Sequence, residues 1–496
     1  MRRSGREALR AAMVLVVVGA VAPSGVAHAQ SESWDAVYLA GSKVGHMRIR
    51  VEPVKDRDRQ LVRIRVDYNL TFKRGESTSA MEVQYGTIET PEGQVLRLDT
   101  RTMVSKQVIR VHGDVHDNQM SLKIENGVQK QEKVIPWSSD VLGPYGPELS
   151  LSRKPIKPGE VRVIRTFMPD INKIADATLT ARALEPVALG GGVNRDLLRV
   201  DQEIAFEGKP SPELNSTLWI DEGGQVLKSF TDANGGMTVY RTTREAALRQ
   251  APLVDLIGAS IVKVARRITN PEGSRNVLYK VTMTDADPAK IFPNDRRQTL
   301  RPSDEPRTAV LEVKTAGPED GTPGPESVDA EYSRSNPMIT SDDAKVIAHS
   351  RRAIGTATDP WAKAQAITRW VHANIKDKNF ETSFAPADEV ANSLEGDCTE
   401  HGVLTAAMCR AQGIPARVVT GLVYANQLGG FGFHMWNEVY VNRRWVAIDS
   451  AFDESQVDAV HIKLSESSLD GVAPFETFLM VSRVFGKLKL EPVEVR

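Results

Sequence analysis

Three residues in the C-terminal part of the chain have side chains that could together activate a nucleophile: a cysteine, a histidine and an aspartate. Cys398 follows Asp397 at the start of a predicted helix. A thiol in the first turn of a helix lies at the positive end of the helix dipole, which favours the thiolate and lowers the pKa of the thiol. His434 could accept the thiol proton, and Asp449 could orient the histidine ring and stabilise its charged form. These residue types therefore fit a Cys-His-Asp triad.

The residues around Cys398 predict how a helix would present it. Asp397 is a good N-cap, and Glu400 stands three residues later, as in a capping box. The helix is predicted over residues 399–411 and ends at Gly413. Cys409 lies eleven residues after Cys398, which is ~16 Å along one helix and too far for a disulfide. We therefore expect two free thiols, with Cys409 as an inert core residue.

A hairpin is predicted to bring the histidine and the aspartate together. Residues 416–423 are typical of a strand, and residues 433–441 and 445–449 are typical of two strands joined around Asn442. His434 and Asp449 are almost equally distant from that turn, so their side chains should face each other across the strand pair.

Four ordered motifs also make the region recognisable; they are Gly396-Asp397-Cys398-Thr399-Glu400-His401 and residues 413–421, 434–441 and 445–449. Over residues 340–455 the chain resembles the bacterial exported transglutaminase-like superfamily. The resemblance implies a papain-like α/β fold in which Cys398 is the nucleophile, His434 the general base and acid, and Asp449 the orienting carboxylate. It also implies attack on an amide or ester carbonyl to form a thioester, which water or an amine then resolves. Ser450-Ala451 stands where the family often has Pro-Thr, which affects the turn and not the triad.

The superfamily includes non-catalytic members, so two functions are compatible with these motifs. The first is a cysteine protease, amidase or acyltransferase that acts on a peptide or protein substrate. The alternative is a non-catalytic module of the cell envelope that binds a peptide or a partner protein. Catalysis would need an oxyanion donor beside the backbone N–H of Cys398, for which Trp361 and Asn392 are both candidates.

The elements before this domain predict an α+β fold. Residues 30–249 show apolar side chains at every second position, as Met47, Ile49 and Val51 do, which predicts a large antiparallel β-rich domain with one polar face. A smaller β-rich segment is expected over 250–316 and a Pro/Gly-rich linker over 317–335. The transglutaminase-like domain would occupy 336–496.

Composition and the N-terminus limit location and partners. The 496 residues carry 63 Lys and Arg against 64 Asp and Glu, a balance that argues against nucleic-acid binding. Residues 1–29 have the basic start, short apolar run and Ala-His-Ala end of a cleaved signal peptide. A periplasmic or secreted protein with no membrane span in the mature chain is expected, with an envelope protein as a further partner. No cofactor and no metal are implied: His112 and His116 have helical metal-pair spacing, but His112-Gly113-Asp114 is typical of a turn.

Overall fold

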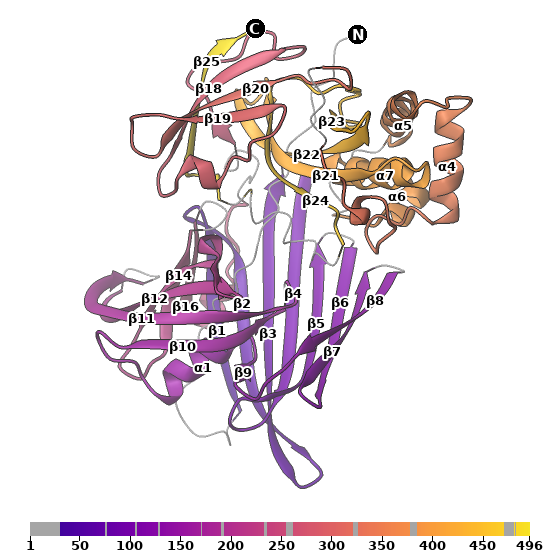
Figure 1. Ribbon diagram of the computed structural model, residues 1–496. Helices are drawn as coiled ribbons and strands as arrows, with labels where there is room; N and C mark the ends of the chain where they lie inside the picture. The colour runs from indigo at the N-terminus through magenta and orange to yellow at the C-terminus, as the bar shows by residue number, and fades with distance from the viewer. Residues whose placement is uncertain are drawn as a thin grey trace. The chain divides into compact units, whose positions relative to one another are not determined.

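The structure is a computed structural model that divides the chain into two compact units, with a boundary between residues 255 and 256. The described residues are 30–74, 77–104, 107–126, 129–169, 171–189, 193–232, 236–253, 261–320, 326–376, 384–470, 481 and 483–496. Residues 1–29, where a signal peptide is predicted, lie outside them. The predicted α+β fold is confirmed, because the first unit is built on a large sheet and the second combines helices with sheets (Figure 1).

The first unit is built on one sheet of 16 strands, in which nearly all neighbours are antiparallel. Its strands are β1 (Ser31–Leu39), β2 (Ser42–Asp56), β3 (Arg59–Arg74), β4 (Ser77–Glu89), β5 (Val95–Val104), β6 (Gln107–His116), β7 (Gln119–Asn126), β8 (Gln129–Pro136), β9 (Val141–Leu142), β10 (Val161–Met168), β11 (Lys173–Ala188), β12 (Asn194–Phe206), β13 (Lys209–Pro210), β14 (Ser216–Ile220), β15 (Val226–Thr231) and β16 (Met237–Thr242). Two short helices, α1 (Gly146–Arg153) and α2 (Arg244–Leu248), belong to the same unit. The order is β8-β7-β6-β5-β4-β3-β2-β1-β16-β15-β14-β12-β11-β10-β9, so the first eight strands follow one another as hairpins.

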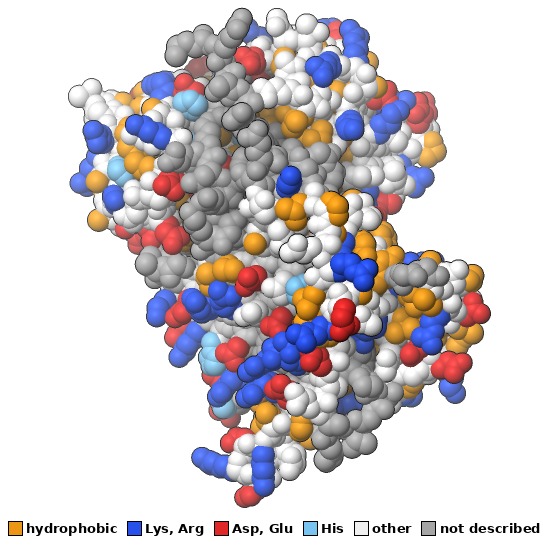
Figure 2. All heavy atoms as spheres, turned by 180° about the vertical axis from the view of Figure 1, so that it is seen from behind, with side chains coloured by type: hydrophobic (Ala, Val, Ile, Leu, Met, Phe, Trp, Pro, Cys, Tyr) orange, Lys and Arg blue, Asp and Glu red, His pale blue; other side chains and the backbone are white. Residues whose placement is uncertain are grey.

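The sheet has the polar face that the alternation predicts. Met47 and Ile49 of β2 are buried, whereas Arg48 and Arg50 between and after them pair with Glu32 and Asp67 on adjacent strands. In Figure 2, Lys and Arg side chains gather in a band on the face that is shown, and Asp and Glu side chains lie beside it.

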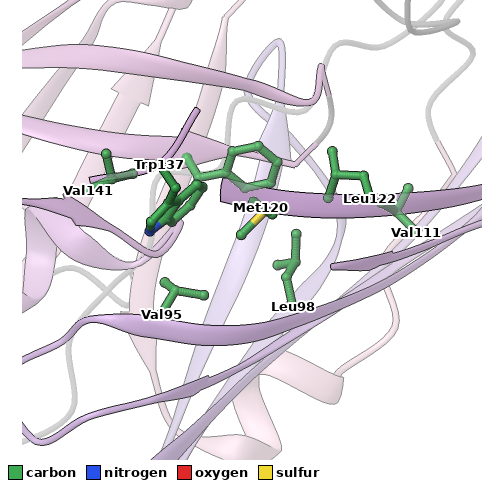
Figure 3. Packing of buried hydrophobic residues seen from close by; sticks show 8 residues of the cluster. Val95, Leu98, Val111, Met120, Leu122, Trp137 and Val141 are labelled. Atoms are coloured by element: carbon green, nitrogen blue, oxygen red, sulfur yellow. The ribbon is translucent and has the colours of Figure 1, made fainter. Parts of the chain in front are cut away.

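The other face closes over an apolar core (Figure 3). The core joins strands near the two opposite ends of the strand order, and its buried residues are Val95, Leu98, Val111, Met120, Leu122, Trp137, Val141 and Phe167. The rings of Trp137 and Phe167 lie 5.6 Å apart, and a bridge links Gln94 to Leu142. Because β9 and β10 share this core with β5 to β7, the sheet must curl over on itself.

The described residues of the second unit include two smaller sheets and the α-helices α4 to α7. One sheet has the order β17-β22-β21-β24 with β23 beside β22, and the other has the order β19-β20-β18-β25. Its strands are β17 (Val262–Lys263), β18 (Asn276–Met283), β19 (Gln298–Pro302), β20 (Thr308–Lys314), β21 (Ala416–Ala425), β22 (Gly430–Val441), β23 (Arg444–Ile448), β24 (His461–Ser467) and β25 (Leu488–Val495). Its helices are α4 (Ala344–Ile354), α5 (Pro360–Asn374), α6 (Ala387–Ser393) and α7 (Cys398–Ala411).

The segment predicted as a small β-rich region pairs with the last strand of the chain. β18 lies between β20 and β25, with Val277 opposite Val495. The described part of the predicted linker also makes contacts: Tyr440 Oη donates a hydrogen bond to the carbonyl of Glu326 at 2.6 Å. The predicted domain limits, 30–249, 250–316, 317–335 and 336–496, remain a proposal.

None of the described helices is long and apolar enough to cross a lipid bilayer.

Candidate active site

Cys398 is the first residue of α7 and is 9% exposed. The predicted capping box is present: the Asp397 side chain accepts from Thr399 N at 2.9 Å, and Glu400 Oε2 accepts from Asp397 N at 3.0 Å. Gly396 has φ +137°, and a Cβ there would lie 2.4 Å from the Cβ of Glu400. The glycine therefore lets the chain turn sharply into the helix that carries the thiol.

The first turns of α7 make hydrogen bonds to the segments that carry the other two predicted residues, His434 on β22 and Asp449 directly after β23. The carbonyl of Gly402 accepts from Asn437 Nδ2 of β22 at 2.8 Å. Thr405 Oγ1 lies 2.8 Å from the hydroxyl of Ser450, the residue after Asp449. Ser450, which replaces the Pro expected from the family pattern, thus links the aspartate segment to α7 through its hydroxyl.

His434 and Asp449 are brought together by the predicted hairpin. The turn consists of Asn442 and Arg443, both with positive φ, as a tight two-residue hairpin requires. The centre of this turn lies slightly later in the chain than the point midway between His434 and Asp449. The two residues are therefore diagonal neighbours on one face of the strand pair, and not directly opposite each other. His434 Nε2 donates to Asp449 Oδ2 at 2.7 Å, and both side chains are buried.

Aromatic rings hold His434 in its orientation. The ring of Phe452 stacks on it with centroids 4.6 Å apart and planes 20° apart. Trp436 lies 6.2 Å away at 21°. With Nε2 bonded to Asp449, Nδ1 is the ring nitrogen that could serve the thiol.

A second histidine, which the sequence reasoning missed, contacts the same aspartate. His461 of β24 is 1% exposed, and its Nε2 lies 3.2 Å from Asp449 Oδ2. Its Nδ1 lies 2.8 Å from Asp458 Oδ1. A signal was available: residues 460–464 read Val-His-Ile-Lys-Leu, a buried strand pattern that contains two ionisable side chains.

The charges of this cluster shift its pKa values strongly. Burial alone would raise the pKa of Asp449, but the charges and hydrogen bonds of His434 and His461 hold that pKa well below its usual range. Burial would lower the pKa of His461, but Asp449, Asp458 and Glu454 raise it to about 10. Burial raises the pKa of Glu454 to about 7, although the charge of His461 acts in the opposite direction.

Two overlapping groups of these residues have the spacing that a metal ion would need. They are His434, Asp449 and His461, and Glu454, Asp458 and His461, with ligand atoms within 4.8 Å of one another. In this structure the ring nitrogens of His434 and His461 lie within hydrogen-bond distance of the carboxylates of Asp449 and Asp458.

The remaining sequence candidates have other environments. Cys409 lies fully buried on α7, where burial raises its pKa to about 12, and neither cysteine forms a disulfide. Asn392 Nδ2 donates to the carbonyl of Asp388 at 2.7 Å and its Oδ1 accepts from Lys345, which favours a structural role. Trp361 is half-buried near the start of α5. His112 lies inside β6 and bonds Asp99 and Asp114, so the turn predicted at 112–114 is wrong.

Comparison with known proteins identifies the domain that holds this site. Residues 347–450, which include Cys398, His434 and Asp449, match the model of the transglutaminase-like superfamily. The chain therefore carries a transglutaminase-like domain, and the resemblance predicted from its four motifs is confirmed. No curated protein matches the chain.

Several solved structures are similar over part of the chain. A candidate cysteine protease from Cytophaga hutchinsonii is 18% identical, with 39% of this chain and 79% of that chain covered and a TM-score of 0.28. A beta-barrel-like protein of unknown function from Brucella abortus is 12% identical, with 44% and 98% covered and a TM-score of 0.33. A candidate protease from Parabacteroides distasonis is 9% identical, with 74% and 69% covered and a TM-score of 0.19. At these TM-scores the similarities say nothing about what this chain does.

Proposed function

We propose that this protein is an exported thiol enzyme that attacks amide bonds of a peptide or protein substrate through Cys398. His434 acts as general base and acid, and Asp449 orients its ring. The observation that supports this most directly is the 2.7 Å hydrogen bond from His434 Nε2 to Asp449 Oδ2 within a transglutaminase-like domain. It stabilises one ring orientation and leaves Nδ1 for the thiol.

The proposed reaction has two steps. The Sγ thiolate attacks the amide carbonyl carbon, the C–N bond breaks, and His434 gives its proton to the leaving amine as the thioester forms. Water or a second amine then attacks the thioester and loses a proton to His434, and the C–S bond breaks to restore the thiolate. Water gives a protease or amidase, and an amine gives an acyltransferase.

The test is the pH dependence of iodoacetamide alkylation at Cys398, read by mass spectrometry in the intact protein. We expect an apparent pKa well below the ~8.5 of a free thiol, and a return toward that value in His434→Ala. Cys409 is an internal control on the same helix and should stay unmodified while the protein is folded. A normal pKa at Cys398, or no reaction before unfolding, would reject the enzyme and favour the peptide- or partner-binding module.

The proposed location can be checked separately. Cleavage after Ala29 would give a mature protein that begins at Gln30 in the periplasm or the medium. The N-terminal sequence and intact mass of the exported form measure this. An uncleaved chain that stays in the cytoplasm would contradict export without bearing on the thiol chemistry.

A further inference from the structure

His461 lies behind the proposed triad, between two carboxylates. Its Nε2 faces Asp449 Oδ2 at 3.2 Å and its Nδ1 faces Asp458 Oδ1 at 2.8 Å. An ionised carboxylate can only accept a hydrogen bond, so a ring with a carboxylate at each nitrogen must donate from both. An imidazole that donates from both nitrogens carries a positive charge, and this one is 1% exposed.

We propose that His461 is a positioning residue of this site: an imidazolium that stays charged at neutral pH, holds Asp449 in place and weakens the attraction of Asp449 for the charged form of His434. The inference rests on the function proposed above for Cys398, His434 and Asp449. In an ordinary triad the aspartate charge acts on one histidine. Here one oxygen, Asp449 Oδ2, accepts from His434 at 2.7 Å and from His461 at 3.2 Å.

The position of Asp449 is then fixed from three directions. Besides the two rings, its Oδ1 accepts from Ala451 N at 2.8 Å. The ring of His461 is itself fixed, because Trp436 packs edge-on against it at 5.3 Å and Phe452 at 6.1 Å. A carboxylate with this many partners cannot rotate to follow a moving His434, so the triad geometry is set before a substrate arrives.

The second consequence is electrostatic. The centroids of the His434 and His461 rings lie 5.8 Å apart, within the range in which one charge shifts the titration of another. The other ionisable groups that face His461 are Asp449, Asp458 and Glu454. Arg297 donates to the carbonyl of Asp458 at 2.7 Å, and Asp458 and Glu454 also line a cavity of about 660 Å³. The positive charge of His461 should favour the Cys398 thiolate and disfavour a charged His434.

The charge state of the ring can be measured directly. In the full-length protein labelled with ¹⁵N-histidine, the His461 signals are identified as those that disappear in His461→Gln. We expect both ring nitrogens to stay protonated from pH 6 to at least pH 8. A neutral His461 at pH 7 would overturn the proposal, and this measurement needs neither a substrate nor a reactive thiol.

The effect on the thiol is tested by the alkylation profile of Cys398 in His461→Gln, whose amide can still donate to Asp449 but carries no charge. The alkylation profile should have two inflections, one for the Cys398 thiol and one for the His434 ring. We expect both inflections to move to higher pH by about one unit. His349→Gln is the matched control, since His349 contacts the carbonyl of Ala391 at 3.0 Å on another part of this unit, and its profile should equal that of the wild type. A slower reaction with unshifted inflections would mean a purely structural role and would overturn the proposal.

Asp458→Asn keeps the ring in place and covers the case in which His461→Gln does not fold. It should shift the inflections in the same direction by a smaller amount. A wild-type Cys398 without a lowered pKa would count against the proposed function, whereas a lowered pKa that neither variant shifts would count against His461 alone.

Discussion

Several buried ionisable side chains surround Asp449. Because their pKa values differ between the folded and the unfolded chain, the stability of the second unit should depend on pH. His461 holds its proton more tightly in the folded protein, where its pKa is about 10, than in the unfolded chain, where it is 6.5. Its contribution is therefore fully present below pH 6.5 and is lost as the pH rises toward 10. The pKa of Glu454 is raised from 4.5 to about 7 in the folded protein. Its contribution to stability is therefore also lost as the pH rises, between about pH 4.5 and 7.

We therefore expect the free energy of unfolding of this unit to fall as the pH rises from about 4.5 to 10, by a few kcal/mol in total. Denaturant unfolding at a series of pH values measures it. His461→Gln should flatten the upper part of the profile and Glu454→Gln the lower part. A profile that stays level between pH 6.5 and 10 would show that His461 is not a buried cation.

Individual residues were predictable where a local pattern fixes their environment. The N-cap position of Asp397 follows from the residue types at the start of its helix, and it is confirmed. His461 was not predicted, because its contact with Asp449 depends on how β24 pairs with β21 and not on spacing along the chain.

At the scale of single elements, the start of α7 determines the environment of the thiol. Asp397→Ala should lower the free energy of unfolding by about 1 to 2 kcal/mol, because it removes the N-cap and also one of the two partners of the Thr399 hydroxyl. Asp359→Ala, which removes the exposed N-cap of α5, should cost about 1 kcal/mol. Urea unfolding measures both.

The two variants should differ most in the alkylation of Cys398. Asp397→Ala frays the turn that contains the thiol and should move its apparent pKa toward the free value, whereas Asp359→Ala should leave it unchanged. Equal effects from both caps would indicate that global stability, and not the position of the helix end, controls the thiol.

Helices were more predictable than strands because their ends carry local signals. The apolar residues Ala364, Ile367 and Val371 of α5 recur at helical spacing and are all buried. The turn predicted at Gly113 is wrong for a physical reason: a Cβ there would lie 2.9 Å from Leu122, so the glycine serves close packing between strands.

At the scale of the whole chain, the site depends on residues far from it in sequence. The sheet of β18, β19, β20 and β25 supports the segment around His461: Tyr279 Oη donates to the carbonyl of Ala459 at 3.1 Å, and Gln298 Nε2 to that of Lys463 at 3.0 Å. The sequence predicted a β-rich segment over residues 250–316, but it did not predict β25, and the pairing of β18 with β25 is a long-range contact that no local pattern encodes.

A fragment of residues 256–496 should therefore fold and keep the wild-type alkylation profile of Cys398. A fragment of residues 336–496 lacks β17 to β20, leaves β25 without its partner, and should be largely unfolded by circular dichroism. If the shorter fragment folded and kept the profile, the residues before 336 would have no part in positioning the site.

The pairing of Val277 with Val495 also bears on how the protein is made. A ribosome delivers β18 early in this unit and β25 near its end, so β18 has an open edge throughout most of translation. The sheet that supports His461 closes only after that last strand has emerged. We therefore expect the nascent chain to stay incompletely folded until β25 has been synthesised, and the export proposed above would require such a state.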